Sequence, residues 1–463
     1  MIINIIMFIC MYPVLFILYF CLKGEVESES FKGTLFGIRI SREWLPGEEK
    51  ERFEQDYNKS IKRSMLVLAL TPLLAFFIPY TSLYLTFWCL WIFAAIALFQ
   101  LPYARNYKRL LALKSERTCT DPDNAFQYYE LKYAGNIRCI KWYHLSIPLL
   151  ISGLATLVSL FLLFGQRLQP YGLLMILFFF CNLALGFCAA GMDRMKTQVV
   201  SSDSDVNVNY ARAVKNLWKK FWCTNIWAMT LYMVSLLICF MMPRHTDSLA
   251  FYTILWGSIL LSMALLVLGI ILMNHKAAID KTYKDQMDLK MDNDEKFWIG
   301  GIIYYNPGDP HAMVERKFGT GTSMNMATFP GRVCAVICLL AFLSVPILCC
   351  WMILEEFTPL SLTVQDHMLT AEHVSTDYSI PIESIQEVTL LTELPKSTKV
   401  NGTGMSTLQK GVFRNSTDGR VYKFLNPKNH LFLRIDTGET IYYMSSSSDR
   451  ETQAIYDLLY NAP

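Results

Sequence analysis

Apolar residues along the chain are gathered into seven stretches that contain no Asp, Glu, Lys or Arg. The stretches are Ile2–Leu22, Ser64–Leu101, Leu145–Gln166, Leu168–Met192, Phe221–Pro243, Ser248–His275 and Val333–Leu354. About 20 apolar residues span a bilayer as a helix, so each stretch predicts at least one transmembrane helix. The second is long enough for two, and Pro79-Tyr80-Thr81-Ser82 divides it into a hairpin. The pattern predicts a helical membrane bundle of eight transmembrane helices.

The composition agrees with a membrane protein. Of the 463 residues, 53% are apolar and only 17% are charged, whereas about a quarter of the residues in soluble domains are charged. No charged side chain lies inside a predicted span. Ion-coupled transporters and intramembrane proteases place ionisable residues at membrane depth, so this pattern argues against both classes. Asn182 and Asn225 are the deepest polar residues, and we expect them to make hydrogen bonds between helices.

Positively charged residues alternate between the loops of the two membrane sides. Lys and Arg are abundant in four loops, numbering nine in Lys23–Arg63, eight in Pro102–Lys141, six in Asp193–Lys220 and eight in Lys276–Arg332. The intervening turns carry none at Tyr80–Ser82 and one each at Arg167 and Arg244. The loops rich in Lys and Arg are cytosolic by the positive-inside rule. We therefore expect a multi-pass protein of the cell membrane with both termini outside the cytoplasm.

These stretches divide the chain into four parts. Residues 1–292 form a body of seven spans, residues 293–332 a cytosolic segment, residues 333–354 the last span and residues 355–463 a tail domain. In the first part, Glu48–Arg63 predicts a cytosolic helix that runs into the second span. Ser201–Asn209 predicts a polar loop, and Asn209 is expected to cap a basic helix over Tyr210–Lys220.

Residues 293–332 combine turn-forming residues with aromatic side chains. Asn306-Pro307-Gly308-Asp309-Pro310 forces a turn because both prolines fix φ, and Gly319 and Gly321 predict a second turn. The segment is either a rigid platform that contacts a partner or a loop that packs under the helices, and the residues favour neither. The candidate partner-binding residues are Trp298, Tyr304, Tyr305, Asn306, Pro307, Asp309, Pro310, Phe318, Gly319 and Gly321.

The tail domain alternates between short β-prone runs and turns. The runs are Leu362–Val364, Tyr378–Ile382, Ile385–Leu391, Val412–Arg414, Val421–Leu425, Leu431–Ile435 and Thr440–Tyr443. Turn pairs stand at Asn401-Gly402, Asp418-Gly419 and Thr437-Gly438, and Ser448-Asp449-Arg450-Glu451 is a capping box that begins a last helix. Seven strands and one C-terminal helix predict a small β-barrel with the layout of a pleckstrin-homology-like (PH-like) domain.

Three parts of the chain carry a resemblance to known families. The order of Trp298, Tyr304-Tyr305-Asn306-Pro307, Asp309-Pro310 and Lys317-Phe318-Gly319 resembles the signature of a short uncharacterised domain in multi-pass membrane proteins of Gram-positive bacteria. Ile382–Val388, Leu408–Phe413 and Leu433–Thr437 resemble the bacterial PH-like domain. The first span with Phe36-Gly37-Ile38-Arg39-Ile40 loosely resembles a domain of the immunity protein against a sporulation-delaying toxin. These resemblances imply no catalytic residues.

The charge of the tail domain bears on its ligand. It contains nine Lys and Arg against fourteen Asp and Glu, a net charge of −5. Phosphorylated headgroups need a basic pocket, so we expect a peptide or protein ligand, or self-association, instead of phosphoinositide binding. The acidic pair Asp203 and Asp205 and the acidic residues at 288–295 lack the pattern of a calcium loop. No cofactor, metal or nucleic acid is expected.

Two functions fit this sequence. The chain contains no Walker loop, GxSxG elbow or HExxH helix, so we expect a protein that is not an enzyme. The first function is binding or sensing by the PH-like domain outside the cytoplasm, in envelope homeostasis or in immunity to membrane-active peptides. The alternative is a transporter or permease subunit for an uncharged or zwitterionic substrate. The missing internal repeat argues against this alternative.

Overall fold

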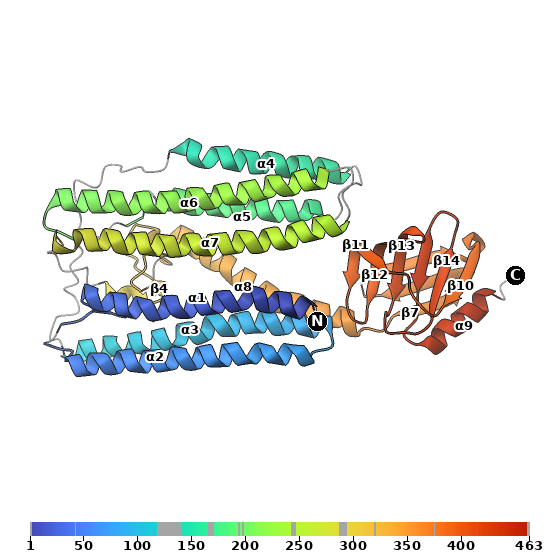
Figure 1. Cartoon of the computed structure of the whole chain (residues 1–463), viewed down its shortest axis with the longest axis horizontal. Helices are drawn as coiled ribbons and strands as arrows, with labels where there is room; N and C mark the ends of the chain where they lie inside the picture. Colours follow the sequence, from blue (N-terminus) through green and yellow to red (C-terminus); the bar gives the residue numbers. More distant parts are fainter. Residues whose placement is uncertain are drawn as a thin grey trace.

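The chain folds into a bundle of long helices followed by a β domain (Figure 1). The computed structural model describes residues 2–41, 43–117, 141–164, 171–192, 195–196, 199–241, 247–286, 294–318, 321–374 and 376–460. The bundle helices are α1 (Ile2–Lys32), α2 (Gly47–Leu70), α3 (Thr81–Arg117), α4 (Trp142–Phe164), α5 (Tyr171–Met192), α6 (Ser204–Met241), α7 (Asp247–Tyr283) and α8 (Phe329–Phe357). A 3-10 helix, Thr71–Phe77, continues α2.

Seven of these helices are long and apolar enough to cross a membrane, judged by length and composition. They are α2 with its 3-10 extension and α3 to α8, whereas the apolar stretch described in α1 is shorter, Met11–Gly24. The chain is therefore a membrane protein, and the eighth span remains a prediction. The predicted division of the second apolar stretch is confirmed, because α3 begins at Thr81 after a non-helical turn.

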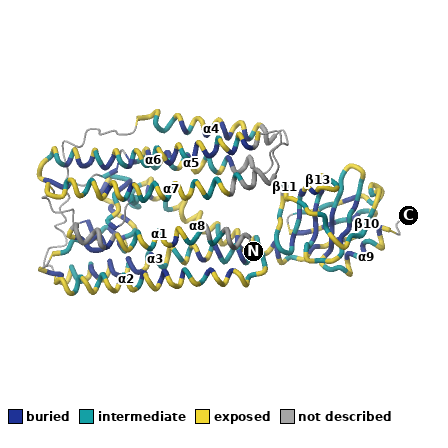
Figure 2. Tube along the Cα trace, viewed as in Figure 1, coloured by how far each residue is buried: buried dark blue, intermediate teal, exposed yellow. Residues whose placement is uncertain are grey.

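The helices pack in two groups. The first helix group is α1, α2 and α3, and the second is α4, α5, α6 and α7 (Figure 1). The last helix, α8, crosses between the groups and packs against α3, where the rings of Phe93 and Phe342 are 4.6 Å apart. Outward faces of α2 and α4 are exposed in Figure 2, and they carry large apolar side chains such as Leu66 and Phe161. Such faces are suited to lipid.

In the second helix group, one of the two asparagines that we expected to bond between helices does so. Asn182 of α5 donates to the Thr230 hydroxyl of α6 at 2.9 Å, and Thr230 donates to the Pro148 carbonyl of α4 at 3.2 Å. Asn225 instead donates to Phe221 O of its own helix at 2.8 Å. The prediction is confirmed for Asn182 and wrong for Asn225, because an Asn side chain also reaches the carbonyl four residues earlier in its own helix.

Two predicted helices have ends that differ from the structure. Helix α6 begins at Ser204 instead of after Asn209, because the Asp203 carboxylate accepts from Asp205 N at 2.8 Å and starts the helix earlier. Helix α8 begins at Phe329, where the Thr328 hydroxyl accepts from Gly331 N at 3.3 Å. The helix also runs three residues past the predicted end, to Phe357.

The β domain and the N-terminal end of α1 lie at the same end of the bundle (Figure 1). The segment between α7 and α8 lies at the opposite end, with the last residues of α3 and the first residues of α6. This arrangement is the one expected if the Lys- and Arg-rich loops share one side of the membrane. Which side faces the cytoplasm remains a prediction.

The β domain consists of two sheets and a helix, and it is not the closed barrel that we predicted. The strands are β7 (Ser361–Gln365), β8 (Met368–His373), β9 (Thr376–Pro381), β10 (Glu387–Leu391), β11 (Ser397–Gly404), β12 (Gln409–Asn415), β13 (Gly419–Leu425), β14 (Phe432–Asp436) and β15 (Ile441–Met444). The three-stranded sheet has the order β7-β8-β9, and the six-stranded sheet has the order β10-β14-β15-β13-β12-β11. Helix α9 (Asp449–Tyr460) confirms the predicted C-terminal helix.

Each predicted strand overlaps an observed one, and two strands, β8 and β11, were missed. The turn before β8 uses Asp366 and His367 with φ of 50° and 59°, which is unusual for residues other than Gly. Asn401-Gly402, predicted as a turn, lies within β11 at a register shift. A Cβ on Gly402 would stand 2.2 Å from Lys410 O, so only Gly fits this irregularity.

A lysine is buried on one face of the six-stranded sheet. Lys423 is 2% exposed beside the core residues Phe413, Val421 and Leu425. Its Nζ donates to Gln409 Oε1 at 3.1 Å and lies 5.1 Å from the centre of the Phe413 ring. Burial lowers the pKa of Lys423 to about 8, because the apolar surroundings disfavour the charged form.

We predict that Lys423→Met stabilises the β domain at pH 7. The pKa is lower in the folded state than in the unfolded state, so the charge destabilises the domain by about 3 kcal/mol below pH 8. Stability of the wild type should then rise from pH 8 to pH 10, and that of Lys423→Met should not. Pulse proteolysis in urea measures both. Equal pH dependence of the two proteins would contradict the prediction.

We also predict that an impermeant thiol reagent labels Ser384→Cys in intact cells and does not label Ser202→Cys. Both positions are exposed, the first in the β domain and the second at the other end of the bundle. The background carries Cys119→Ser and Cys139→Ser, because the other cysteines lie inside the apolar stretches. Labelling after cell lysis is the control, and the reverse result in intact cells would invert the topology.

Candidate functional site

The segment that links α7 to α8 contains all the candidate site residues. We call residues 294–328 the bridge segment; the structure describes it except for residues 319–320. It forms two small hairpins, β3 (Trp298–Ile299) with β4 (Ile303–Tyr304) and β5 (Met313–Glu315) with β6 (Thr322–Met324). The bridge segment lies at the end of the bundle opposite the β domain, where β4 is labelled in Figure 1.

The first hairpin is fixed against α3. Its turn uses Gly300 and Gly301 with φ of 60° and 73°, and a Cβ on Gly301 would stand 2.4 Å from the Tyr103 hydroxyl oxygen. The Tyr103 hydroxyl donates to Gly301 O at 3.1 Å, and the Tyr107 hydroxyl donates to Glu295 O at 2.8 Å. Two tyrosines one helical turn apart therefore hold the backbone of the bridge segment.

Three of its aromatic side chains belong to the core of the first helix group. Trp298, Tyr304 and Phe318 are 8% exposed or less. The Phe318 ring stacks on Tyr103 with centroids 4.3 Å apart, and it meets the edge of Tyr57 at 6.1 Å. Of the two interpretations left open by the sequence, these residues fit the one in which the segment packs under the helices.

A buried polar cluster holds the turn at 306–310. The side chain of Asn325, with 0% exposure, donates to Asn306 O at 2.9 Å and to Asp309 O at 3.0 Å. Its oxygen accepts from Asn306 N at 3.0 Å and from Ala327 N at 3.1 Å. The Tyr304 hydroxyl donates to Asp309 Oδ2 at 3.0 Å. One amide side chain therefore pairs with three backbone groups of the turn and with Ala327 N.

Asp309 is a buried carboxylate with several partners. Its Oδ1 accepts from His311 N at 3.0 Å and lies 2.7 Å from His311 Nδ1, and Lys196 Nζ lies 3.7 Å from Oδ2. Burial raises its pKa, but the hydrogen bonds from His311 and the charge of Lys196 outweigh burial and lower the pKa to about 2. The group is thus an ionised structural anchor at neutral pH.

The second hairpin contacts the other helix group. Met313 packs against α5, where a Cβ on Gly191 would lie 2.5 Å from its sulfur. Glu315 pairs with Lys276 of α7 at 3.1 Å, and Lys276 also pairs with Asp280 at 2.6 Å. At its other end, Glu295 pairs with Lys114 of α3 at 2.5 Å. The bridge segment therefore joins the two helix groups through buried side chains.

The predicted site residues separate into two classes. Trp298, Tyr304, Asn306, Asp309 and Phe318 are buried, and Gly321 is half-buried. Tyr305, Pro307 and Pro310 are exposed beside the exposed apolar side chains Ile299 and Ile303, and Gly319 lies outside the described residues. Only the exposed class offers a surface to a partner, and such binding remains a prediction. Asn325 was missed, because its partners Asn306 and Asp309 are 19 and 16 residues away in the sequence.

A second cluster of buried charges lies where α8 enters the β domain. Glu356 is 5% exposed, and its carboxylate accepts from Thr81 N at 3.1 Å, from Ser82 N at 2.5 Å and from the Ser406 hydroxyl at 2.6 Å. The neighbouring Glu355 pairs with Lys410 at 2.9 Å. Glu356 thus caps the N-terminus of α3 while it holds the loop before β12.

The same lysine lies beside a histidine. Lys410 Nζ lies 3.2 Å from His373 Nδ1, and His373 Nε2 lies 3.2 Å from Thr358 O. Burial and the charge of Lys410 lower the pKa of His373, so its ring is neutral at pH 7. These contacts attach β8 and β12 to the end of α8.

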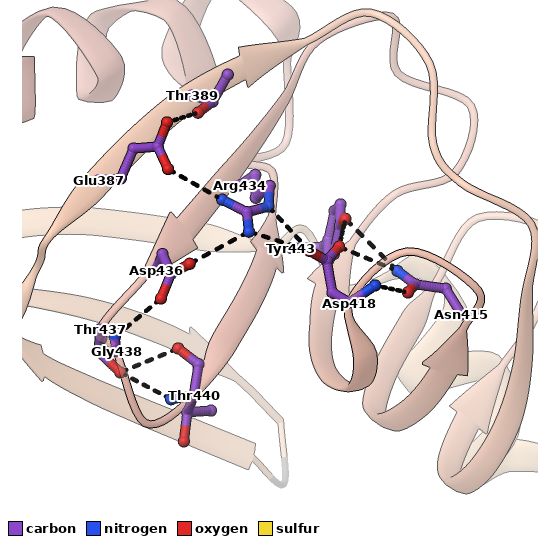
Figure 3. A network of polar contacts seen from close by, with 10 residues as sticks. All are labelled: Glu387, Thr389, Asn415, Asp418, Arg434, Asp436, Thr437, Gly438, Thr440 and Tyr443. Atoms are coloured by element: carbon purple, nitrogen blue, oxygen red, sulfur yellow. Dashed lines mark hydrogen bonds and ion pairs between the residues drawn. The ribbon is translucent and has the colours of Figure 1, made fainter.

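Arg434 lies at the centre of a polar network in the β domain (Figure 3). Its guanidinium lies 3.0 Å from Asp418, 3.2 Å from Asp436 and 3.5 Å from Glu387. Asp418 also accepts from the Tyr443 hydroxyl. Three carboxylates surround this cation, so it is not available to a phosphate group.

The structure was also searched for metal sites, and the chain was compared with known proteins. Among the residues that the structure describes, no three or more His, Cys, Asp and Glu side chains gather where they could hold a metal ion. No family model, curated protein or solved structure matches the chain. Its function is therefore inferred from the geometry above.

We predict that Asn325→Ala lowers the melting temperature of the detergent-solubilised protein by several degrees. The substitution removes four hydrogen bonds to backbone groups in and beside the turn, and of these groups Asn306 O keeps a second donor, Asp309 N, at 3.3 Å. Each buried backbone group that is left without a partner costs about 1–3 kcal/mol. Tyr305→Ala, which removes an exposed side chain of the same segment, is the control and should melt like wild type. Tryptophan fluorescence reports the transition. Equal melting temperatures for Asn325→Ala and Tyr305→Ala would contradict this role.

Proposed function

We propose that this chain is a non-enzymatic membrane protein whose C-terminal domain, PH-like in its resemblance, binds or senses a ligand outside the cytoplasm. The role would lie in envelope homeostasis or in immunity to membrane-active peptides. The proposal is supported by the place of the β domain, which lies at the end of the bundle away from the Lys- and Arg-rich loops. By the positive-inside rule, that end faces the exterior.

The observation that carries the proposal is the attachment of the β domain to the bundle. Helix α8 ends at Phe357, and β7 begins only four residues later. In the last turn of α8, the Glu356 carboxylate accepts hydrogen bonds from the first backbone amides of α3 and from the Ser406 hydroxyl of the β domain. A ligand that shifts the β domain would therefore act directly on two membrane helices, as a sensor requires.

The charge distribution favours a cationic peptide or protein as the ligand. The domain has a net charge of −5. Of its cations, Lys410 pairs with Glu355, Lys423 is buried, and Arg434 contacts three carboxylates. An acidic surface attracts cationic partners and repels phosphorylated headgroups. Many membrane-active peptides are cationic and amphipathic, which links the charge to the proposed immunity role.

The alternative is a transporter or permease subunit. It is favoured by the separation of the helices into two groups that are joined at their ends, since transport requires one group to move against the other. Uptake of a zwitterionic solute into proteoliposomes, with no protection against peptides, would favour this alternative.

We predict that cells producing the protein survive a higher concentration of a cationic membrane-active peptide than cells without it. Glu356→Gln should reduce this protection several-fold, because the amide is a weaker acceptor for the α3 amides and separates the domain from the bundle. Glu383→Gln removes the same charge at an exposed position and should protect like wild type. Immunoblots of membranes verify equal amounts, and absence of protection by the wild type would contradict the proposal.

A further inference from the structure

A groove of about 260 Å³ lies between α6 and α7, near the end of the bundle that carries the bridge segment. It extends along α6 from Ala213 to Thr224, which corresponds to about 16 Å of helix. On α7 its lining residues recur at helical spacing from Leu268 to Ile279, so the groove follows both helices and runs parallel to the bundle. It was not among the sites that the sequence suggested.

The charged and amide side chains of the groove lie near its middle, and the part of the groove that reaches deeper into the membrane is mainly apolar. This apolar part is lined by Phe221, Leu268, Ile271 and Leu272, all of which lie inside charge-free stretches. The rest of the groove reaches the ends of those stretches. The groove therefore crosses the depth at which the chain changes from apolar to charged.

The middle of the groove carries positive charge. It is lined by Asn216, Lys220 and His275, and the lining of the groove includes no acidic residue. Lys220 of α6 and His275 of α7 are exposed. The nearest buried lysine of α7, Lys276, is neutralised by Asp280 and Glu315 and faces the bridge segment instead. Among the residues that the structure describes along this groove, Lys220 has no acidic neighbour in the lining.

The depth of Lys220 in the bundle agrees with the level of lipid headgroups. Trp222, which is half-buried, lies on α6 within one turn of Lys220, and tryptophan is enriched at membrane interfaces. A basic side chain at this depth meets phosphate groups of the leaflet, and the apolar stripe beyond it meets acyl chains.

We propose that this groove binds an anionic phospholipid, with its phosphate at Lys220 and His275 and one acyl chain along Leu268, Ile271 and Leu272. From Lys220 and His275 the groove continues along Leu268, Ile271 and Leu272 into the charge-free stretches, as the acyl chain of a phospholipid continues from its phosphate. The charge of Lys220 is complementary to an anionic headgroup. The inference does not depend on the proposed function of the β domain.

The test uses the full-length protein in detergent, mixed with equal amounts of phosphatidylglycerol and phosphatidylcholine and examined by native mass spectrometry. The wild type should retain phosphatidylglycerol several-fold over phosphatidylcholine. The double variant Lys220→Gln/His275→Gln should lose that preference. Lys281→Gln is the matched control, because it removes an exposed charge from α7 outside the groove and should leave the preference intact.

Three outcomes would overturn the inference. Equal retention of both lipids by the wild type would indicate only unspecific lipid around the bundle. An unchanged preference in the double variant would place the anionic lipid elsewhere. Displacement of the lipid by soluble glycerol phosphate would assign the site to free phosphate, since the acyl chain would then contribute no binding.

Discussion

The two helix groups of this protein are joined at their ends by buried ion pairs and hydrogen bonds. Apolar contact between membrane helices gains little over contact with lipid, so helices in a bilayer depend on close packing and on polar contacts. Between these groups, the pair of Glu315 with Lys276 and the pair of Glu295 with Lys114 supply such contacts at one end. Removal of one partner of a buried pair typically costs about 3–5 kcal/mol, so the arrangement of the two groups depends on the bridge segment.

The β domain provides the corresponding connection at the other end. Glu356 joins it to α3, Glu355 joins its strand β12 to α8, and β11 lies beside the first residues of α7. The domain therefore touches both helix groups, and its position constrains their separation. Two helix groups that are fastened to each other at both ends can transmit a displacement from one end to the other.

The sequence identified the spans because a charge inside a bilayer is costly, and this rule acts on each helix independently. It also identified seven of the nine strands of the β domain and α9, whose patterns are local. The order of the strands could not be predicted from the sequence, because it depends on contacts between residues that are distant in the chain. The parallel pair of β13 with β15 is such a contact, and it rules out a simple meander. The turn at Asp366-His367 was not predicted because it contains no Gly. Asn401-Gly402 has the sequence of a turn but lies inside β11.

The sequence marked the bridge segment by its proline, glycine and aromatic residues, and it left open whether these residues face a partner or pack under the helices. Whether such residues face a partner or the protein's own core depends on which helices lie beside them, and Tyr57, Tyr103 and Tyr107 belong to distant parts of the chain. The surroundings of each side chain also distinguish the paired cations of the protein from Lys220. Lys276, Lys410 and Arg434 have carboxylate partners within 3.5 Å, whereas Lys220 lines a groove without acidic residues. A cation left in that position, at the boundary of the apolar zone, acquires its counter-ion from outside the chain, and in a bilayer that counter-ion is a lipid phosphate.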